Sequence, residues 1–278
     1  MAVCIAWKNN GQCAKTVCRA IRQITLSRIY MQRMPISISK KDIVSCRNCS
    51  LSKFCLPRGL TVDEMKILEK AIDKSKKIKK KEYLYNTNSQ QAALYAIKSG
   101  SIKTYLSSAS GDEQILGFHL SGDLVGFDAF YTGKHSCSAQ ALDDTLVCEL
   151  SMQNFEKLCK TLPSIREEMM HQVGKEIQHD HLAMLTLGQM QTEERLATFL
   201  FNLSQRNRMR NFSETEFQLS MPRQDLANYL GMAVETLSRI LSNLQKKNII
   251  AVQRRGIKVL DQERLRDLAH ISCQSPED

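Results

Sequence analysis

The 278-residue sequence has no apolar run that approaches the about 18–20 residues of a membrane-spanning helix. The N-terminus also lacks the apolar core of a secretory signal peptide. Both absences favour a cytoplasmic protein, in a reducing compartment where structural disulfides are uncommon. The ten cysteines are therefore better explained by metal binding, redox chemistry or burial than by cross-linking.

Motifs that would indicate catalysis are also missing. The sequence shows no Gly-rich phosphate loop, no nucleophile–base pair and no paired acid and base, so we do not expect an enzyme. A redox enzyme that carries a metal cluster is one alternative, and turnover of a substrate would be needed to support it.

Acidic residues are absent from residues 1–40, which contain seven Lys or Arg and so supply most of the net charge of +10. A basic total favours a polyanionic partner. We expect residues 1–40 to form a basic, flexible extension. A nucleic-acid arm, an organelle-targeting peptide and a dispensable segment before a second start at Met31 or Met34 are open alternatives.

The length predicts two domains, and the first of them has a β texture. Short alternating runs between Leu84 and Leu150 are separated by tight-turn signals. The predicted features are a hairpin that turns at residues 98–100, a second hairpin that turns at residues 121–123, and strands over Ser138–Ala141 and Thr145–Leu150. Many short strands at close spacing favour a sandwich or barrel.

A long helix is predicted to follow, beginning near Pro163, which suits a first helical turn. Residues on one face then recur at alternating spacings of three and four, as in a coiled coil. They are Met170, Val173, Ile177, Asp180, Met184 and Leu187. Because the opposite face is strongly polar, we expect a dimerisation helix rather than a core helix. Asp180 occupies a position where an apolar residue is expected.

The stretch "SMPRQDLANYLGMAVETLSRIL" predicts a helix-turn-helix, with two short helices joined at Gly231. Three polar residues face away from the apolar stripe within the first two turns of the second helix: Glu235, Ser238 and Arg239. In this motif such positions meet base edges in the major groove of double-stranded DNA. Two short strands around residues 254–256 predict a basic wing. Residues 221–258 contain seven basic and two acidic side chains, which suits phosphate contact.

Three cysteines lie within "SCRNCSLSKFC", at Cys46, Cys49 and Cys55. A zinc site would need a second close pair or a nearby His pair, and the nearest histidine is His119. An iron–sulfur cluster accepts a remote fourth cysteine, because four thiolates need only converge in space. Cys137, Cys148 and Cys159 are the candidates. Iron–sulfur ligation is favoured, with zinc and unliganded burial left open.

Several stretches resemble the FNR-type transcription regulators, the oxygen-responsive branch of the cyclic-AMP-receptor superfamily. They include "CRNCSLSKFCLP", "GDEQILGFHLSGDLVGFDAF" and "NYLGMAVETLSRIL", and the resemblance runs from about Ser45 to the C-terminus. It implies an α+β fold: an antiparallel, jelly-roll-like β-roll of the cyclic-nucleotide-binding type, a long dimerisation helix and a winged helix-turn-helix. The implied segments are a cysteine-rich loop at 41–61, the β-roll at 62–161, the helix at 162–190 and the DNA-binding domain at 191–278.

Residue by residue, the resemblance implies that Cys46, Cys49, Cys55 and Cys148 ligate a [4Fe–4S] cluster. It implies a homodimer that binds inverted repeats with TTGAT-like half-sites at low oxygen, with Glu235, Ser238 and Arg239 at the bases. Oxygen would destroy the cluster and switch binding off. RNA polymerase would be contacted through exposed loops such as Ser108–Glu113, and promoters would be activated or repressed. The alternative is a zinc-stabilised or cluster-free constitutive regulator of the same fold.

Relatives that bind cyclic nucleotides hold the ribose and phosphate with a Glu and an Arg-Ser pair. Here the corresponding residues read Gly126-Phe127-Asp128 and Cys137-Ser138, so no cation lies where a phosphate would need one. We therefore expect no cyclic nucleotide as ligand. Residues 1–40 lie outside the resemblance, and it assigns no role to Cys4, Cys13 and Cys18.

Overall fold

The structure is a computed structural model that describes residues 45–269. The expectations for residues 1–40 and for Cys4, Cys13 and Cys18 lie outside the described residues. No helix in the described part of the chain is both long enough and apolar enough to cross a bilayer.

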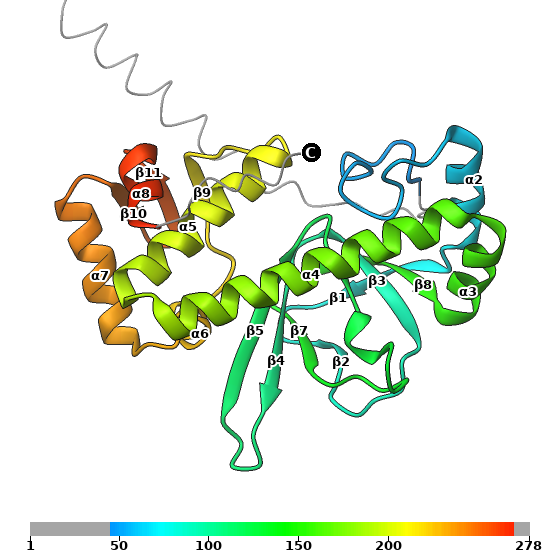
Figure 1. Ribbon diagram of the computed structural model, residues 1–278, viewed down its shortest axis with the longest axis horizontal. Coiled ribbons are helices and arrows are strands. Elements are labelled where there is room, and N and C mark those ends of the chain that lie inside the picture. The colour runs from blue at the N-terminus through cyan, green and yellow to red at the C-terminus, as the bar shows by residue number, and fades with distance from the viewer. Residues whose placement is uncertain (1–44, 270–278) are drawn as a thin grey trace, which may run out of the picture. The chain divides into compact units, whose positions relative to one another are not determined.

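Figure 1 labels most of the helices and strands of the described chain, and its colours follow the sequence. In the first part they are α2 (Val62–Ala71), β1 (Lys74–Ile78), β2 (Tyr83–Tyr85), β3 (Ala93–Ser99), β4 (Ser101–Ser107), β5 (Glu113–Leu120), β6 (Leu124–Val125), η1 (Phe127–Ala129), β7 (Ser138–Ala141), β8 (Thr145–Ser151) and α3 (Met152–Thr161). They are followed by α4 (Pro163–Gln189), α5 (Thr192–Met209), β9 (Glu216–Gln218), α6 (Arg223–Tyr229), α7 (Val234–Lys246), β10 (Ile250–Gln253), β11 (Gly256–Val259) and α8 (Gln262–Leu268).

The β-roll consists of two four-stranded antiparallel sheets, with strand orders β1-β8-β3-β6 and β2-β7-β4-β5. Apolar side chains from both sheets form one buried cluster, which includes Ile78, Ile97, Ile102 and Val147. Alternate residues of paired strands point to the same face, so each sheet can bury one face against the other. The predicted fold class is confirmed: an antiparallel β-roll, a long helix and a winged helix-turn-helix.

Both predicted hairpins are wrong, although their turns and strands exist. β3 and β4 belong to different sheets, and so do β5 and β6. Gly100 and Gly122 have φ angles of 88° and 96°, and each turn carries the chain from one sheet to the other. Glycine marks tight corners as well as hairpin turns, so the local signal could not separate the two. The actual hairpin joins β4 to β5 across residues 108–112.

The C-terminal part is built around a second apolar core. Buried leucines of α5, α6 and α7 pack together, among them Leu196, Leu226 and Leu237. A three-stranded sheet in the order β10-β11-β9 completes the winged unit. The predicted helix pair and wing are confirmed, whereas β9 and α8 carry no strong sequence signal.

Contacts between the β-roll and the DNA-binding part are both apolar and polar. Phe118 on β5 joins the buried apolar cluster of the C-terminal part, and its ring lies 5.2 Å from that of Tyr229 on α6, centroid to centroid. The carboxylate of Asp123 accepts hydrogen bonds from the guanidinium groups of Arg206, on α5, and of Arg210, which caps the C-terminal end of α5. The distance from Arg210 Nη2 is 2.6 Å. The side-chain amide of Asn228 on α6 pairs with the outer edge of β5, accepting from Ile115 N–H at 2.8 Å. Lys103 on β4 is buried, with its Nζ 3.3 Å from the carboxylate of Asp225.

Candidate cluster-binding and DNA-binding sites

The cysteine loop is held by its own turns and by one glutamate. Backbone N–H groups of Cys49 and Cys55 donate to the carbonyls of Cys46 and Leu51. The carboxylate of Glu69 on α2 accepts from the N–H of Arg47 at 3.0 Å. These bonds satisfy the polar backbone of a segment without helix or strand and fix where its cysteine side chains point.

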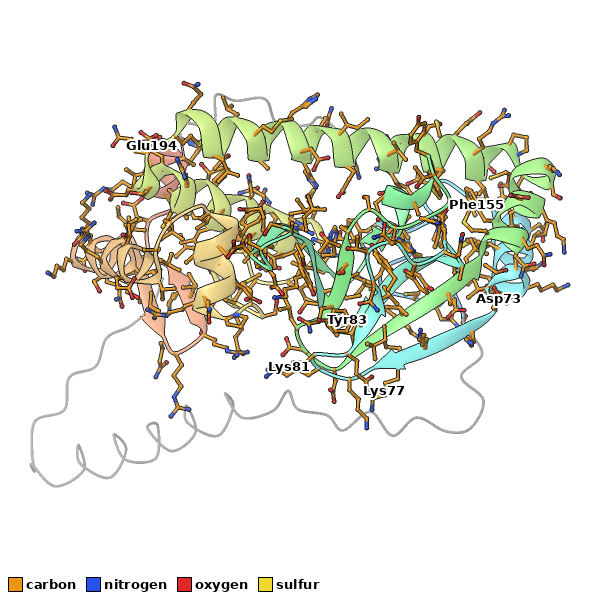
Figure 2. The ribbon with its side chains drawn as sticks, turned by 90° about the horizontal axis from the view of Figure 1, so that it is seen from below. Asp73, Lys77, Lys81, Tyr83, Phe155 and Glu194 are labelled. Atoms are coloured by element: carbon orange, nitrogen blue, oxygen red, sulfur yellow. The ribbon has the colours of Figure 1, made fainter. Side chains whose placement is uncertain are left out.

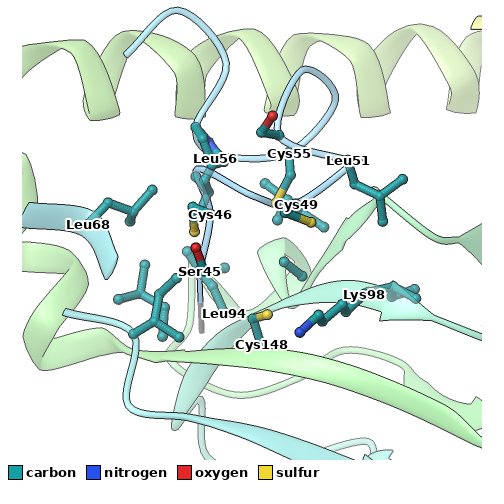
Figure 3. A pocket seen from close by; sticks show the side chains of 17 residues that line it. Ser45, Cys46, Cys49, Leu51, Cys55, Leu56, Leu68, Leu94, Lys98 and Cys148 are labelled. Carbon is teal, nitrogen blue, oxygen red and sulfur yellow. The ribbon is translucent and has the colours of Figure 1, made fainter. Parts of the chain in front are cut away.

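Four cysteines line one pocket, which Figure 3 shows from close by. Cys46, Cys49 and Cys55 come from the loop, and Cys148 comes from β8, which lies between β1 and β3. The remaining candidates for a fourth ligand lie elsewhere. Cys137 is buried between the two sheets, and Cys159 lines a different hollow beside α3. All six cysteines of the described chain are free thiols.

The pocket wall is apolar apart from the cysteines, two serines and one cation. Burial raises the pKa of Cys46 to about 12, and the neighbouring Cys148 adds to this rise. Burial also raises the pKa of Cys55 and of Cys148. The ammonium group of Lys98 acts in the opposite direction on Cys46 and Cys148, and in Figure 3 it points toward Cys148. With pKa values raised in this way, the free thiols of Cys46, Cys55 and Cys148 stay protonated at neutral pH.

The donor set fits an iron–sulfur cluster. Within residues 45–269 no three His, Cys, Asp or Glu side chains are placed so as to hold a single metal ion. A cubane cluster presents four separate irons, so its four thiolates lie farther apart than the ligands of one ion. Four sulfur donors in an apolar pocket with one nearby Lys match the needs of a buried, negatively charged cluster.

The pocket is connected physically to the long helix α4. Leu56 of the cysteine loop belongs to the same buried apolar cluster as Ile165 and Met169 in the first turns of α4. Beyond this core, Arg58 Nη1 lies 3.0 Å from His171 Nε2 on α4. A change in the conformation of the loop would therefore act on α4 through these contacts.

The predicted dimer seam of α4 is exposed in the single chain. Met170 and Met184 expose 61% and 65% of their surface, and Ile177 exposes 48%. Leu187 and Asp180 are also exposed, while Val173 is half-buried. A row of large apolar side chains facing solvent on one helix is typical of a surface that another chain covers.

The helix-turn-helix places the three predicted base-contacting residues on an open face. Leu237, Leu241 and Leu244 bury the inner side of α7. Glu235 and Arg239 are exposed and Ser238 is half-buried on the other side. Gly231, with φ of 60°, forms the turn between α6 and α7. A side chain there would be strained and would approach Leu187 and Arg195.

Two arginines that the sequence reasoning missed also belong to this region. Arg223, at the start of α6, points its Nη1 toward Ser238 Oγ at 3.5 Å. It adds a cation beside the face of α7 that carries Glu235, Ser238 and Arg239, which is called the reading face below. Arg195 on α5 donates to the carbonyls of Leu187 on α4, at 2.9 Å, and of Leu230, at 3.1 Å. It therefore ties the end of α4 to the helix-turn-helix. Nothing in the local pattern marks it, because its partners are carbonyl groups.

The β-roll contains a further polar network, around the half-buried side chain of Asp128. Asp128 Oδ2 accepts from the N–H groups of Ser136 and Cys137 at 2.8 and 3.3 Å, and Asp128 Oδ1 lies 3.1 Å from His135 Nδ1. The imidazole of His135 stacks on Tyr85, with ring centroids 3.6 Å apart. The carboxylate thus engages two backbone donors beside the Cys137-Ser138 pair.

Two family models match the chain: the cyclic nucleotide-binding domain over residues 75–162 and the Crp-like helix-turn-helix domain over residues 194–268. Together with the fold they define the class, a DNA-binding transcription regulator of the cyclic-AMP-receptor superfamily. The match to the cyclic nucleotide-binding domain describes the fold of the β-roll and does not identify a ligand. The chain is 43% identical over 226 residues to the fumarate nitrate reduction regulatory protein of Klebsiella oxytoca, covering 81% of this chain and 90% of that protein.

Similar figures hold for the fumarate and nitrate reduction regulatory protein of Vibrio cholerae: 42% identity over 232 residues, with 84% of this chain and 93% of that protein covered. The chain belongs to this family, the FNR-type transcription regulators. Among solved structures, FixK2 from Bradyrhizobium japonicum has a TM-score of 0.66 at 28% identity and covers 72% of this chain and 98% of its own.

Proposed function

We propose that the protein is an oxygen-responsive transcription regulator in which Cys46, Cys49, Cys55 and Cys148 hold a [4Fe–4S] cluster. The convergence of these four thiols in one apolar pocket is the observation that carries the proposal. The names of the curated relatives, which refer to fumarate and nitrate reduction, agree with control of anaerobic metabolism. The cluster, when bound, supplies a group that oxygen can oxidise and dismantle.

The chain's own residues convert the state of the pocket into DNA binding. Leu56 of the cysteine loop packs against Ile165 and Met169 of α4, so a change in the conformation of the loop moves α4. The exposed seam of α4 then pairs with a second copy of the chain. In the dimer, two copies of α7 reach two half-sites of an inverted repeat about one helical turn apart, with Glu235, Ser238 and Arg239 at TTGAT-like bases.

Two further parts of the proposal concern partners. The exposed turn at 108–113 would contact RNA polymerase. No cyclic nucleotide would act as ligand, because the Asp128 carboxylate already accepts from the N–H groups of Ser136 and Cys137 and would repel a phosphate. The protein would act in the cytoplasm and would not be an enzyme.

Single cysteine-to-serine variants test the cluster ligands. Replacing any of Cys46, Cys49, Cys55 or Cys148 should abolish the brown visible absorption of the anaerobically reconstituted protein and its specific DNA binding, because one iron then lacks its thiolate. Cys137→Ser and Cys159→Ser are matched controls, and both should keep the cluster. A full cluster in Cys148→Ser together with its loss in Cys137→Ser would show that the fourth ligand is wrong. A colourless protein with stoichiometric zinc would contradict the cluster itself.

A further inference from the structure

The four-cysteine pocket contains one charged side chain, that of Lys98 on β3. Among the described residues, the rest of its lining consists of cysteines, serines and apolar side chains, without a carboxylate. Lys98 is half-buried, and within residues 45–269 its ammonium group forms neither an ion pair nor a hydrogen bond. A partly buried cation without a counter-charge costs free energy, so its position requires an explanation.

The pairing of β3 with β8 brings Lys98 to the pocket. Ala96 lies directly opposite Cys148, and Lys98, two residues later, lines the pocket with it. The side chain of Ile97 belongs to the core between the two sheets. The register shifts between Ile97 and Ser99, so Lys98 is the extra residue of a β-bulge and has no partner on β8. Bulges of this kind direct a side chain away from the regular alternation of a strand.

The charge of Lys98 acts on two of the four thiols. Figure 3 shows its ammonium group pointing toward Cys148. Burial is the main influence on the pKa of Cys46 and of Cys148 and raises both, while Lys98 opposes the rise. Glu69, a carboxylate that also acts on Cys46, is engaged by the N–H and the Nε of Arg47, at 3.0 and 3.5 Å. Lys98 is therefore free to interact with the charge that the cysteines acquire when they bind a group.

An ordinary surface role does not account for these features. Lysine side chains commonly lay their aliphatic stem on apolar surface and extend the ammonium group into water. Lys77, on β1 of the same sheet, is of this kind: it is exposed, and Figure 2 shows its side chain directed away from the sheet. The ammonium group of Lys98 is instead directed at a cysteine inside the pocket. This arrangement suits an anionic occupant.

We propose that the Lys98 ammonium group is the counter-charge of the cluster and sets how readily oxygen oxidises it. The proposal rests on the proposed function, in which the four cysteines ligate a [4Fe–4S] cluster. Four thiolates outweigh the charge of the iron–sulfur core, so the ligated cluster is an anion whose potential depends on the charges and hydrogen bonds around it. Lys98 binds no iron and acts only through its charge, as a positioning residue of the site.

Lys98 opposes the first step of oxidation. In this step one electron passes from the cluster to dioxygen, which becomes superoxide, and the cluster becomes less negative by one charge. A cation beside the cysteines stabilises the more negative state by Coulomb attraction. Removal of the cation therefore makes the loss of the electron more favourable and lowers the reduction potential of the cluster.

The test compares the anaerobically reconstituted full chain with Lys98→Met, which keeps the length of the side chain and removes its charge. The variant should bind the cluster. In voltammetry on an electrode its one-electron reduction should shift about tenfold toward the oxidised form, a fall in midpoint potential of about 59 mV. In air-saturated buffer its brown absorption should decay several-fold faster than that of the wild type. Lys98→Arg keeps the charge and should restore both values.

Two further variants separate charge from packing. Lys77→Met is the matched control, because it removes the same charge from the same sheet outside the pocket, and it should match the wild type in potential and in decay. Lys98→Gln is a second neutral variant and should resemble Lys98→Met. A shift in only one of the two neutral variants would overturn the proposal. A defect that Lys98→Arg does not restore would also overturn it, because such a defect marks a packing role.

Failure of the proposed function gives a different result. A wild-type protein that takes up no iron–sulfur cluster would refute the proposed function, and the role of Lys98 with it. A wild-type protein that takes up the cluster and has the same potential and decay rate as both neutral variants would refute the role of Lys98 alone.

Discussion

Arg239 and Lys258 are two basic residues of the same winged unit with different expected roles. Arg239 is exposed on the reading face of α7, where its planar guanidinium can pair with a guanine. Lys258 lies on β11, with its Nζ 3.9 Å from the carboxylate of Glu216 on β9. A wing lysine of this kind contacts phosphate rather than base edges.

Replacing these residues separates base reading from phosphate contact. Arg239→Ala should cost about 1–3 kcal/mol at one base-pair position and relax specificity there. Lys258→Ala should weaken binding evenly across sequences and reduce the salt slope by about 1. Titrations against the operator, single-base variants and random DNA measure both effects. Equal losses on specific and random DNA for Arg239→Ala would place this residue among the phosphate contacts.

Glu176 on α4 has an unusual protonation state. Burial, with the neighbouring carboxylate of Asp180, raises its pKa to about 7, and Asp123 adds to the rise while Arg206 opposes it. In the unfolded chain the pKa of a Glu side chain is about 4.3. Between these two pKa values the folded protein binds the proton and the unfolded chain does not, so this residue's contribution to stability decreases as pH rises through that window.

Glu176→Gln should remove this pH dependence. The variant keeps the size and hydrogen-bonding groups of protonated Glu176 but cannot ionise. Relative to the wild type it should gain stability as pH rises from about 5 to above 7. Urea unfolding of the cluster-free proteins at several pH values measures this difference. A gap between variant and wild type that does not change with pH would refute the raised pKa.

Helix α4 contacts both the cysteine loop and the helix-turn-helix. Its first turns pack against the cysteine loop through Ile165 and Met169. Its last turn is tied to the helix-turn-helix by Arg195, which donates to carbonyls on both sides. The exposed seam lies between these two attachments. A shift or rotation of this one element would therefore reach both the dimer interface and the reading helix.

Asp180 should destabilise the dimer that forms through α4. In the proposed dimer two Asp180 carboxylates approach across an apolar seam, where like charges repel and burial of an unpaired charge is costly. We expect the intact cluster to favour a helix arrangement that relieves this pair. Asp180→Ala should therefore give a dimer that persists in air and binds DNA without a cluster.

Sedimentation of the cluster-free Asp180→Ala protein beside the cluster-free wild type measures this effect. Gln178→Ala, an exposed position of α4 outside the seam, is the control and should match the wild type. If the Asp180 variant and the wild type are equally monomeric, Asp180 does not destabilise the dimer.

Sequence patterns predicted the elements better than their pairing. The heptad spacing and the turn at Gly231 are local signals. The structure has a helix, α4, over the heptad positions, and the two helices α6 and α7 on either side of Gly231. Gly100 and Gly122 were correctly placed in turns, but a turn residue does not reveal which sheet the next strand joins. The C-x2-C-x5-C spacing could not identify a fourth cysteine, and only the resemblance singled out Cys148. Cys148 lies across the pocket from the loop because its strand, β8, pairs with β1 and β3.

At the scale of the whole molecule, the β-roll and the DNA-binding part are linked by charged groups far apart in sequence. Asp123 binds Arg206 and Arg210, and Lys103 binds Asp225 on the first helix of the helix-turn-helix. No local pattern predicts such pairs, because each partner alone resembles an ordinary surface charge. The β-roll therefore meets the DNA-binding part through these charged pairs and through shared apolar packing around Phe118, in addition to α4.

The central claim is that the state of the four-cysteine pocket controls DNA binding. A single anaerobic sample of the reconstituted protein, mixed with a fluorescent operator duplex, can be titrated with oxygenated buffer while visible absorption and DNA anisotropy are recorded together. We predict that the cluster absorption and the bound fraction fall in parallel over the same additions of oxygen. Binding that persists after the absorption has disappeared would contradict the account.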